Sequence, residues 1–324
     1  MVYYYGVESE HNKLIKASSA LGLLFTAFLW GVSFVSMKES LDVIPPIFLL
    51  AFRFTIATVF MLFICLPKLK RINKKTLLHG IIAGVCIFIA YTLQTIGCKY
   101  TTAGKNAFLT TVYVILVPLL GALLFRKKLN LFSITAAIIA IVGIGLISLS
   151  GEKGVNIGDV LTLIGSIFFA IHMILLGDFT QTDDVFLITL LQFLFASVLF
   201  WSSAFIFEDI PSQSAVFNIE TIGTILFLGI FPSGIAFLLQ SVGQKHISAT
   251  ASSAIFSLEA VFGAVAGAIY LHETMSTPAI FGCAIIFIAV ILSQLEGNPF
   301  KKKTKPDSTE EQPPQPRQDE QSNK

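Results

Sequence analysis

Two charged residues lie deep inside long apolar segments of the sequence. Glu259 falls about eleven residues into one such segment, and Arg53 falls about eight residues into another. A charged side chain at the centre of a bilayer costs about 2.5–3.5 kcal/mol on insertion scales, and such residues usually face a cavity or a partner. Burial favours the neutral form of a carboxyl group, so Glu259 is a candidate for binding a proton or another cation. Arg53 could attract a carboxylate of a bound molecule. The alternative is a structural role for both, as an ion pair or in hydrogen bonds to backbone carbonyls.

Uncharged polar residues accompany this pair at helical spacing. Asn106, Thr110 and Tyr113 are four and then three residues apart, which places them on one face of a helix. Ser257 precedes Glu259 by two residues. Serine and threonine hydroxyls in membrane helices often bond only the carbonyl four residues earlier or a neighbouring helix, so for hydroxyls alone the structural interpretation is favoured. Asn106, Thr110, Tyr113 and Ser257 are candidate binding residues.

Trp30, Ser33 and His172 complete the candidate set. Trp30 could form an aromatic wall of a binding cavity, or serve only in packing. His172 lies mid-segment and is a second candidate for carrying a proton, although a lone histidine is more often a hydrogen-bonded packing residue. Gln94 and Gln240 are expected near helix ends, bonded to neighbouring helices.

Motifs of catalysis, metal binding or nucleotide binding are absent from the sequence. The histidines at 11, 79, 172, 246 and 272 form no ligand cluster, and the GIG at 143–145 lacks the third glycine of a nucleotide fingerprint. No GxSxG, HExxH or P-loop occurs. No basic stretch is interleaved with aromatic residues, so nucleic acid is not an expected partner. We therefore expect no cofactor, no metal and no enzymatic activity. The four cysteines, all in or beside apolar runs, are expected to pack as small apolar residues.

Composition indicates that these segments lie in lipid. Hydrophobic residues make up 54% of the 324-residue chain, and charged residues make up 13%. Soluble domains carry about 25% charged residues, and one soluble domain could not bury so many helices that are apolar all round. With about 20 apolar residues needed per crossing, ten transmembrane helices are predicted. They cover residues 19–37, 46–66, 78–98, 103–125, 130–149, 159–177, 185–207, 221–242, 249–271 and 277–295.

The distribution of Lys and Arg predicts the orientation. With both termini in the cytoplasm, fifteen Lys and Arg near helix ends fall inside and four fall outside, as the positive-inside rule requires. Residues 1–18 are then a cytoplasmic N-terminal segment. Residues 297–324 are hydrophilic and are expected to form a disordered cytoplasmic tail.

The two halves of the chain repeat each other. QTIGCKYTTA (94–103) matches QSVGQKHISA (240–249) at an offset of 146 residues, which also aligns Tyr113 with Glu259. FLWGVSF (28–34) matches IFFAIHM (167–173) at an offset of 139, which sets Ser33 against His172 and Arg53 against Gln192. Five helices per half is an odd number, so the second copy enters the membrane with the opposite orientation. The predicted fold is an all-α polytopic membrane protein with inverted five-helix repeats at 19–149 and 159–296, joined by a linker at 150–158. In secondary transporters of this architecture the substrate site lies near the midplane between the repeats.

The sequence resembles the drug/metabolite transporter superfamily, and within it the EamA-type ten-helix members. The resemblance covers about residues 18–296 and rests on five motifs. They are Trp30-Gly31-x-Ser33-Phe34, Arg53-Phe54, GKNAFLTTVYVILVPLL (104–120), Gly158-Asp159 and SLEAVFGAVAGAIYLHE (257–273). Two departures stand out. Ala260 replaces a proline common in the family, which argues against a kink there, and Arg126-Lys127-Lys128 replaces an acidic residue that often closes the fourth helix.

The resemblance implies a transporter of small polar metabolites, such as amino acids or related compounds, that acts by efflux through alternating access in the cell membrane. The expected partners are a small-molecule substrate, the lipid bilayer and a coupled proton or cation. A sugar or nucleotide-sugar carrier is the main alternative and should show more cations facing the cavity than Arg53 alone. A membrane-embedded enzyme acting on lipid-linked substrates would need a catalytic cluster at one membrane surface.

The GxxxG spacings at Gly80/Gly84 and Gly263/Gly267 predict close helix packing within the subunit, with a homodimer interface as the alternative.

Overall fold

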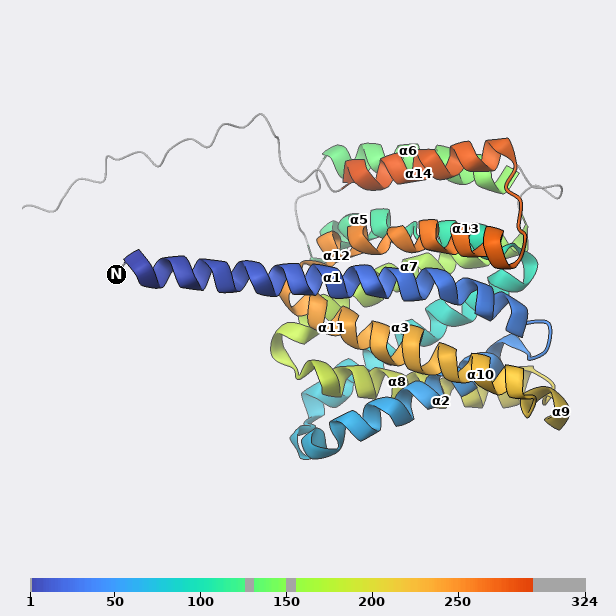
Figure 1. Cartoon of the computed structure of the whole chain (residues 1–324), viewed down its shortest axis with the longest axis horizontal. Helices are drawn as coiled ribbons and strands as arrows, with labels where there is room; N and C mark the ends of the chain where they lie inside the picture. The colour runs from blue at the N-terminus through green and yellow to red at the C-terminus, as the bar shows by residue number, and fades with distance from the viewer. Residues whose placement is uncertain (1, 126–130, 150–155, 294–324) are drawn as a thin grey trace, which may run out of the picture.

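The structure, a computed structural model, describes residues 2–125, 131–149 and 156–293. All regular elements in these ranges are helical (Figure 1). In chain order they are α1 (Val2–Ser40), α2 (Pro46–Cys65), the 3₁₀ helix η1 (Leu66–Arg71), α3 (Lys74–Tyr100), α4 (Ala103–Thr110), α5 (Tyr113–Phe125), α6 (Leu131–Leu149), α7 (Ile157–Thr182), α8 (Val185–Phe207), α9 (Gln213–Val216), α10 (Ile219–Leu228), the π-helical η2 (Gly229–Ile235), α11 (Ala236–His246), α12 (Ala249–Phe256), α13 (Leu258–Tyr270) and α14 (Thr277–Ser293).

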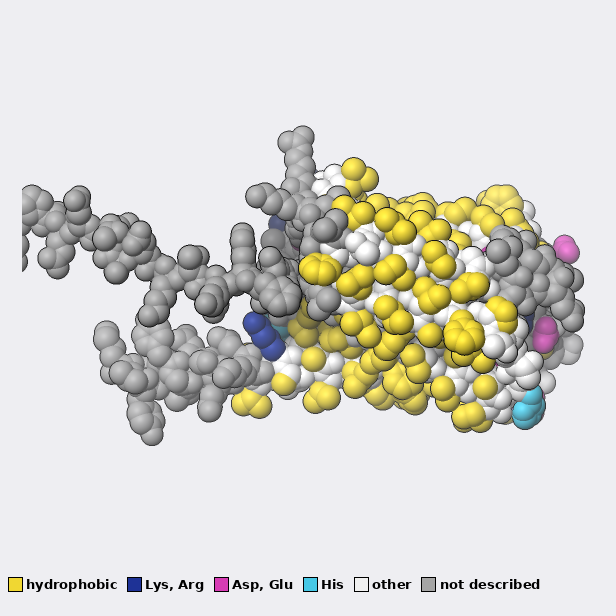
Figure 2. All heavy atoms as spheres, turned by 90° about the horizontal axis from the view of Figure 1, so that it is seen from above, with side chains coloured by type: hydrophobic (Ala, Val, Ile, Leu, Met, Phe, Trp, Pro, Cys, Tyr) yellow, Lys and Arg dark blue, Asp and Glu magenta, His cyan; other side chains and the backbone are white. Residues whose placement is uncertain are grey.

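The longer elements form ten apolar rods, in which α4 with α5, α10 with η2 and α11, and α12 with α13 each make one rod. The rods run roughly parallel or antiparallel through the molecule (Figure 1). Eight helical stretches are long and apolar enough to cross a membrane, and shorter apolar stretches lie in α6 and α14. The face seen in Figure 2 carries many hydrophobic side chains along the length of the rods. This surface suits contact with lipid tails, and the predicted ten-helix all-α fold with two repeats is confirmed. The predicted linker at 150–158 and tail at 297–324 lie largely or wholly outside the described residues.

Three of the rods are interrupted, whereas the sequence predicted continuous helices over 103–125, 221–242 and 249–271. The first is interrupted at Thr111–Val112, between α4 and α5, and the third at Ser257, between α12 and α13. The interruption at Ser257 lies three residues before Ala260, and α13 is continuous through Ala260 itself. Thr111 and Ser257 are repeat equivalents at the offset of 146. In the second rod the interruption is the π-helical turn η2, which contains Pro232. Proline cannot donate a backbone hydrogen bond, so the regular helix is disturbed there.

The two ends of the bundle differ in charge. The chain turns at residues 66–73, 183–184 and 247–248 at the end where α1 begins, which we call the amino-terminal end. It turns at 41–45, 101–102, 208–218 and 271–276 at the opposite end, which we call the far end (Figure 1). In the view of Figure 2 the acidic side chains lie at the far end, and the visible Lys and Arg lie toward the amino-terminal end.

Close packing joins the two halves. A Cβ on Gly84 of α3 would lie 2.8 Å from the Gln192 backbone oxygen of α8, and a Cβ on Gly80 would lie 2.4 Å from Leu191 Cβ. Small residues let helix backbones approach this closely, so this GxxxG pair packs within the subunit. Helices α2 and α8 are also joined at both ends. The Glu208 carboxylate accepts hydrogen bonds from the first N–H groups of α2, and Lys68 forms an ion pair of 3.0 Å with Asp184.

Candidate functional site

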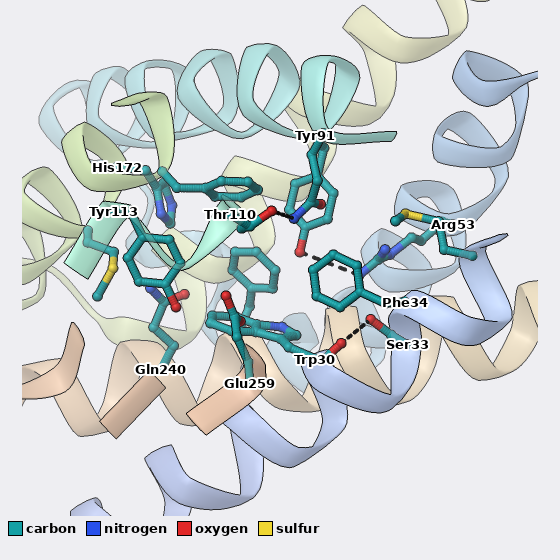
Figure 3. A pocket seen from close by; sticks show the side chains of 15 residues that line it. Trp30, Ser33, Phe34, Arg53, Tyr91, Thr110, Tyr113, His172, Gln240 and Glu259 are labelled. Atoms are coloured by element: carbon teal, nitrogen blue, oxygen red, sulfur yellow. Dashed lines mark hydrogen bonds between the residues drawn. The ribbon is translucent and has the colours of Figure 1, made fainter. Parts of the chain in front are cut away.

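A cavity lies between the two halves, with a volume of about 480 Å³ including its opening. Helices α1, α2, α3, α4 and α5 of the first half and α7, α11 and α13 of the second half contribute side chains to its wall (Figure 3). The lining residues are Trp30, Ser33, Phe34, Met37, Arg53, Tyr91, Gln94, Thr110, Tyr113, Phe169, His172, Met173, Phe237, Gln240 and Glu259.

The lining follows the internal repeat. Twelve of the fifteen lining residues form six pairs related by the two sequence offsets. At 139 these are Trp30–Phe169, Ser33–His172 and Phe34–Met173, and at 146 they are Tyr91–Phe237, Gln94–Gln240 and Tyr113–Glu259. Both halves therefore supply equivalent positions, and the cavity lies where an inverted repeat places a shared site. The charged residues break the symmetry, since Arg53 corresponds to Gln192 and Glu259 to Tyr113.

Arg53 is held at one side of the cavity by the opposite half of the chain. Its side chain is 2% exposed, its Nε donates a hydrogen bond of 2.6 Å to Ser233 Oγ, and its Nη2 donates a long one of 3.4 Å to Tyr91 Oη. The guanidinium carbon lies 4.8 Å from the centre of the Tyr91 ring, within the range of a cation–π interaction. No Asp or Glu of the described residues lies within 4.0 Å of it in an ion pair. A guanidinium has five N–H donors, so Arg53 retains donors for an anionic group.

Glu259 and Tyr113 line the cavity from the two interrupted rods. Glu259 lies in the first turn of α13, directly after the interruption at Ser257, and Tyr113 is the first residue of α5. Both side chains are 3% exposed and point into the cavity (Figure 3). Neither Glu259 Oε1 nor the Tyr113 hydroxyl makes a hydrogen bond of good geometry with a described residue, although the two side chains are close enough to interact with each other. Unsatisfied buried polar atoms are costly and call for an explanation. A polar group of a bound molecule would satisfy both atoms.

The other predicted cavity residues are fixed by local contacts. Trp30 Nε1 donates a hydrogen bond of 2.8 Å to the Pro232 carbonyl, and the Ser33 hydroxyl bonds the Trp30 carbonyl at 2.7 Å. His172 Nε2 lies 2.9 Å from Gln192 Oε1. The Thr110 hydroxyl accepts a hydrogen bond of 3.0 Å from Gln94 Nε2. These contacts hold the wall in place around the two charged residues.

Two predicted residues lie outside the lining. Asn106 is fully buried, and its Nδ2 donates hydrogen bonds to the Gln94 carbonyl and, at 2.8 Å, to Thr162 Oγ1. Its amide therefore joins α3, α4 and α7. Ser257 bonds the carbonyl of Ala254 at 2.6 Å, at the interruption of its own rod. For these two residues the structure favours the structural interpretation over substrate contact.

Several lining residues were not predicted from the sequence. The aromatic wall includes Tyr91, Phe169 and Phe237, none of which was a candidate. Gln94 and Gln240 lie six residues before the ends of α3 and α11, and Gln94 bonds Thr110 of the neighbouring helix as expected, while both also line the cavity. The signal that identifies them is the repeat offset, because each is the equivalent of another lining residue. Among the described residues, no group of three His, Cys, Asp or Glu side chains could hold a metal ion.

Comparison with known proteins identifies the family. The EamA-like transporter family matches residues 17–149 and again residues 156–295, one match on each half. The chain belongs to the EamA-like transporter family. This EamA chain is 31% identical over 275 residues to an uncharacterized transporter of Archaeoglobus fulgidus, with 85% of each chain covered. It is 23% identical to the uncharacterized transporter YoaV of Bacillus subtilis, over 84% of this chain and 95% of that one.

A solved crystal structure shares the fold of this EamA chain. The TM-score is 0.65 at 18% sequence identity, and the match covers 86% of this chain and 97% of the other. Family and relatives together identify a multi-pass membrane protein and a transporter of the drug/metabolite superfamily rather than an enzyme.

Proposed function

We propose that this EamA protein is a secondary carrier that exports small polar metabolites, amino acids or related compounds, across the cytoplasmic membrane by alternating access. The observation that carries the proposal is the cavity lined by six pairs of repeat-related residues. A site shared equally by two inverted halves can be exposed to either side when the halves rock against each other.

The charges in the cavity support a substrate with both an anionic and a cationic group. Arg53 has free donors for a carboxylate, and Glu259 has a free oxygen for an ammonium or hydroxyl group. Aromatic side chains of Trp30, Tyr91 and Phe237 lie in the wall of the same cavity. A sugar-nucleotide carrier would need several cations for its phosphates, and Arg53 is the one Lys or Arg among the lining residues. An α-amino acid matches the charges better.

The end charges support an orientation with both termini in the cytoplasm. Lys68, Lys70, Arg71, Lys74 and Lys75 cluster at the amino-terminal end. Positively charged segments remain on the cytoplasmic side, so the far end faces outward. Glu259 is the candidate for proton coupling, because a carboxyl group in a cavity that opens to alternate sides can take up a proton on one side and release it on the other.

The test is transport by purified protein in liposomes. Liposomes loaded with radiolabelled amino acids, and in parallel with nucleotide sugars, are assayed for protein-dependent exchange. We expect exchange of at least one amino acid and its loss on R53Q, whereas R71Q, at a Lys- and Arg-rich turn outside the cavity, keeps it. Exchange of nucleotide sugars alone, or full activity of R53Q, would contradict the proposed substrate class.

A further inference from the structure

The two ends of the bundle differ in the contacts that join the two halves. At the far end, the start of α4 from the first half is held by two side chains of the second half. At the amino-terminal end, the equivalent position is the start of α12. The two helix starts are repeat equivalents, so a contact made at one and not at the other is a difference between the two ends of the bundle.

Glu273 makes the first of the far-end contacts. Its Oε1 accepts a hydrogen bond of 2.7 Å from the backbone N–H of Ala103, and its Oε2 accepts one of 2.9 Å from Gly104. A carboxylate at a helix N-terminus satisfies free N–H groups and interacts favourably with the helix dipole. Glu273 reaches α4 because His272 before it has a φ of 52°, and the Glu273 N–H bonds back to the carbonyl of Gly267. This left-handed residue ends α13 and turns the chain back toward α4.

Asp159 makes the second contact. Its Oδ2 lies 2.9 Å from Lys105 Nζ, and the two side chains are 0% and 13% exposed. Asp159 is held in place by the capping box at the start of α7, with Asn156 as its partner. Lys105 belongs to α4, so this ion pair again joins the two halves. The start of α4 is thus bound on one side to the end of α13 and on the other to the start of α7.

The repeat equivalents of these residues cannot make the same contacts. At the offset of 146, Lys105 corresponds to Ala251 and Glu273 to Lys127, and at 139 Asp159 corresponds to Ala20. An alanine pair forms no ion pair, and a lysine cannot accept from backbone N–H groups. Lys127 lies outside the described residues, so only its residue type enters this comparison. Among the described residues, these contacts therefore hold the start of α4 and have no counterpart at the start of α12.

Two repeat-equivalent glycines differ in their contacts with described residues. A Cβ on Gly267 would lie 2.7 Å from Glu273 Oε2 and 3.7 Å from the backbone nitrogen of Gly104, so α13 and α4 are in close contact there. Gly121 is the equivalent of Gly267 in the first half. A Cβ on Gly121 would have no described atom within 4 Å. Among the described residues, this close contact between a glycine and the neighbouring helix is made at the far end.

We propose that Glu273 on the α4 N-terminus and the Asp159–Lys105 ion pair form an outer gate that holds the empty carrier closed to the outside. The ion pairs at the amino-terminal end, Lys68–Asp184 and His79–Asp183, join other helices. Among the described residues the start of α12 has no contact like those of α4, so we expect the resting carrier to open toward the cytoplasm and load substrate there, which makes the direction export. This inference rests on the proposed function and on the orientation with both termini inside.

The test measures access to the cavity and does not require transport. Met37 lines the cavity and is 2% exposed, so M37C is labelled with a membrane-impermeant maleimide added to whole cells. The four native cysteines are buried, and the chain without M37C gives the background. We expect slow labelling of M37C, and labelling at least tenfold faster when E273Q or K105E is added to M37C. K105R keeps the positive charge, and E220Q alters an exposed glutamate, so neither should change the labelling rate.

Fast labelling of M37C in the native background, or slow labelling in both E273Q and K105E, would overturn the gate. Faster labelling of these variants only from the cytoplasmic side of inverted vesicles would overturn the export direction. Size-exclusion chromatography in detergent identifies a variant that fails to fold. If E273Q or K105E fails to fold, the labelling rate of the other one tests the gate. Loss of amino-acid exchange with the expected labelling pattern would count against the proposed function alone.

Discussion

Arg53 Nε donates a hydrogen bond of 2.6 Å to Ser233 Oγ, which lies on the π-helical turn of the opposite half. Ser233 follows Pro232 in that irregular turn, so the one Lys or Arg among the described lining residues is held by a π-helical stretch of another helix. π-helical turns frequently mark functional sites. The relationship makes Ser233 a positioning residue for whatever anion Arg53 binds.

S233A should weaken substrate binding without unfolding the protein. Hydrogen bonds to charged groups contribute about 1.5–3 kcal/mol, and 1.4 kcal/mol corresponds to about tenfold in affinity. We expect the KM for exchange to rise about tenfold while kcat changes less. S202A is the matched control, since the Ser202 hydroxyl is exposed and bonds only its own helix, to the Val198 carbonyl. Equal KM values for S233A and the native protein would mean that Ser233 does not position Arg53.

E259Q should remove the response of transport to a pH gradient. Glutamine keeps the size and hydrogen-bonding capacity of the side chain but cannot exchange a proton, so a coupled carrier becomes indifferent to the gradient. The measurement is substrate flux in liposomes with and without an imposed pH difference. E220Q, which alters a glutamate outside the cavity, should respond as the native protein does. An unchanged pH dependence in E259Q would eliminate the proton role of Glu259.

G31A should destabilise the contact between α1 and α13. A Cβ on Gly31 would lie 2.5 Å from Phe262 Cβ and 2.7 Å from the Glu259 carbonyl oxygen, and the latter is backbone that cannot move aside alone. Overpacking of this kind costs about 1–3 kcal/mol. The Tm of the purified protein in detergent should fall by several degrees. In G145A the added Cβ meets no described atom within 4 Å, so its Tm should stay unchanged; a similar fall in both variants would contradict the packing argument.

D183N should lower stability at neutral pH but not in strong acid. Burial alone would raise the pKa of the Asp183 carboxyl, but hydrogen bonds from Thr76, His79 and Thr182 outweigh it, and the pKa lies below the ordinary 3.8. A lowered folded-state pKa means that the carboxylate stabilises the fold above pH 3.8 and that this contribution is lost as the pH falls through the lower value.

The measurement is Tm in detergent from pH 7 to pH 3 for the native protein, D183N and D209N. We expect D183N to melt below the native protein at pH 7, with a difference that narrows toward pH 3. Asp209 is exposed, so D209N should follow the native curve. A difference that stays constant with pH would show that the ionised form of Asp183 does not carry the stabilisation.

The rods were predictable from the sequence because lipid requires long apolar runs, and the inverted repeat was predictable because polar residues such as Gln94 and Gln240 recur in register. The interruptions at Thr111–Val112 and Ser257 were not, because apolar content does not register a local change in backbone hydrogen bonding. Helical spacing grouped Asn106 with Thr110 and Tyr113. Asn106 and Thr110 lie in the same helix α4, but the Asn106 amide bonds the Gln94 carbonyl and Thr162 and does not line the cavity. Residue type alone does not separate Tyr91 or Phe237 from ordinary packing aromatics; their equivalence across the repeat does.

The connections between α2 and α8 have a consequence for measuring motion in this protein. Glu208 ties the start of α2 to the end of α8, and Lys68 with Asp184 ties the two helices together again at the opposite end. Rods fastened at both extremities cannot slide lengthwise past one another. Spin labels on α2 and α8 therefore provide an internal ruler of constant length, against which displacements of α1, α4 and α13 can be calibrated in the same sample.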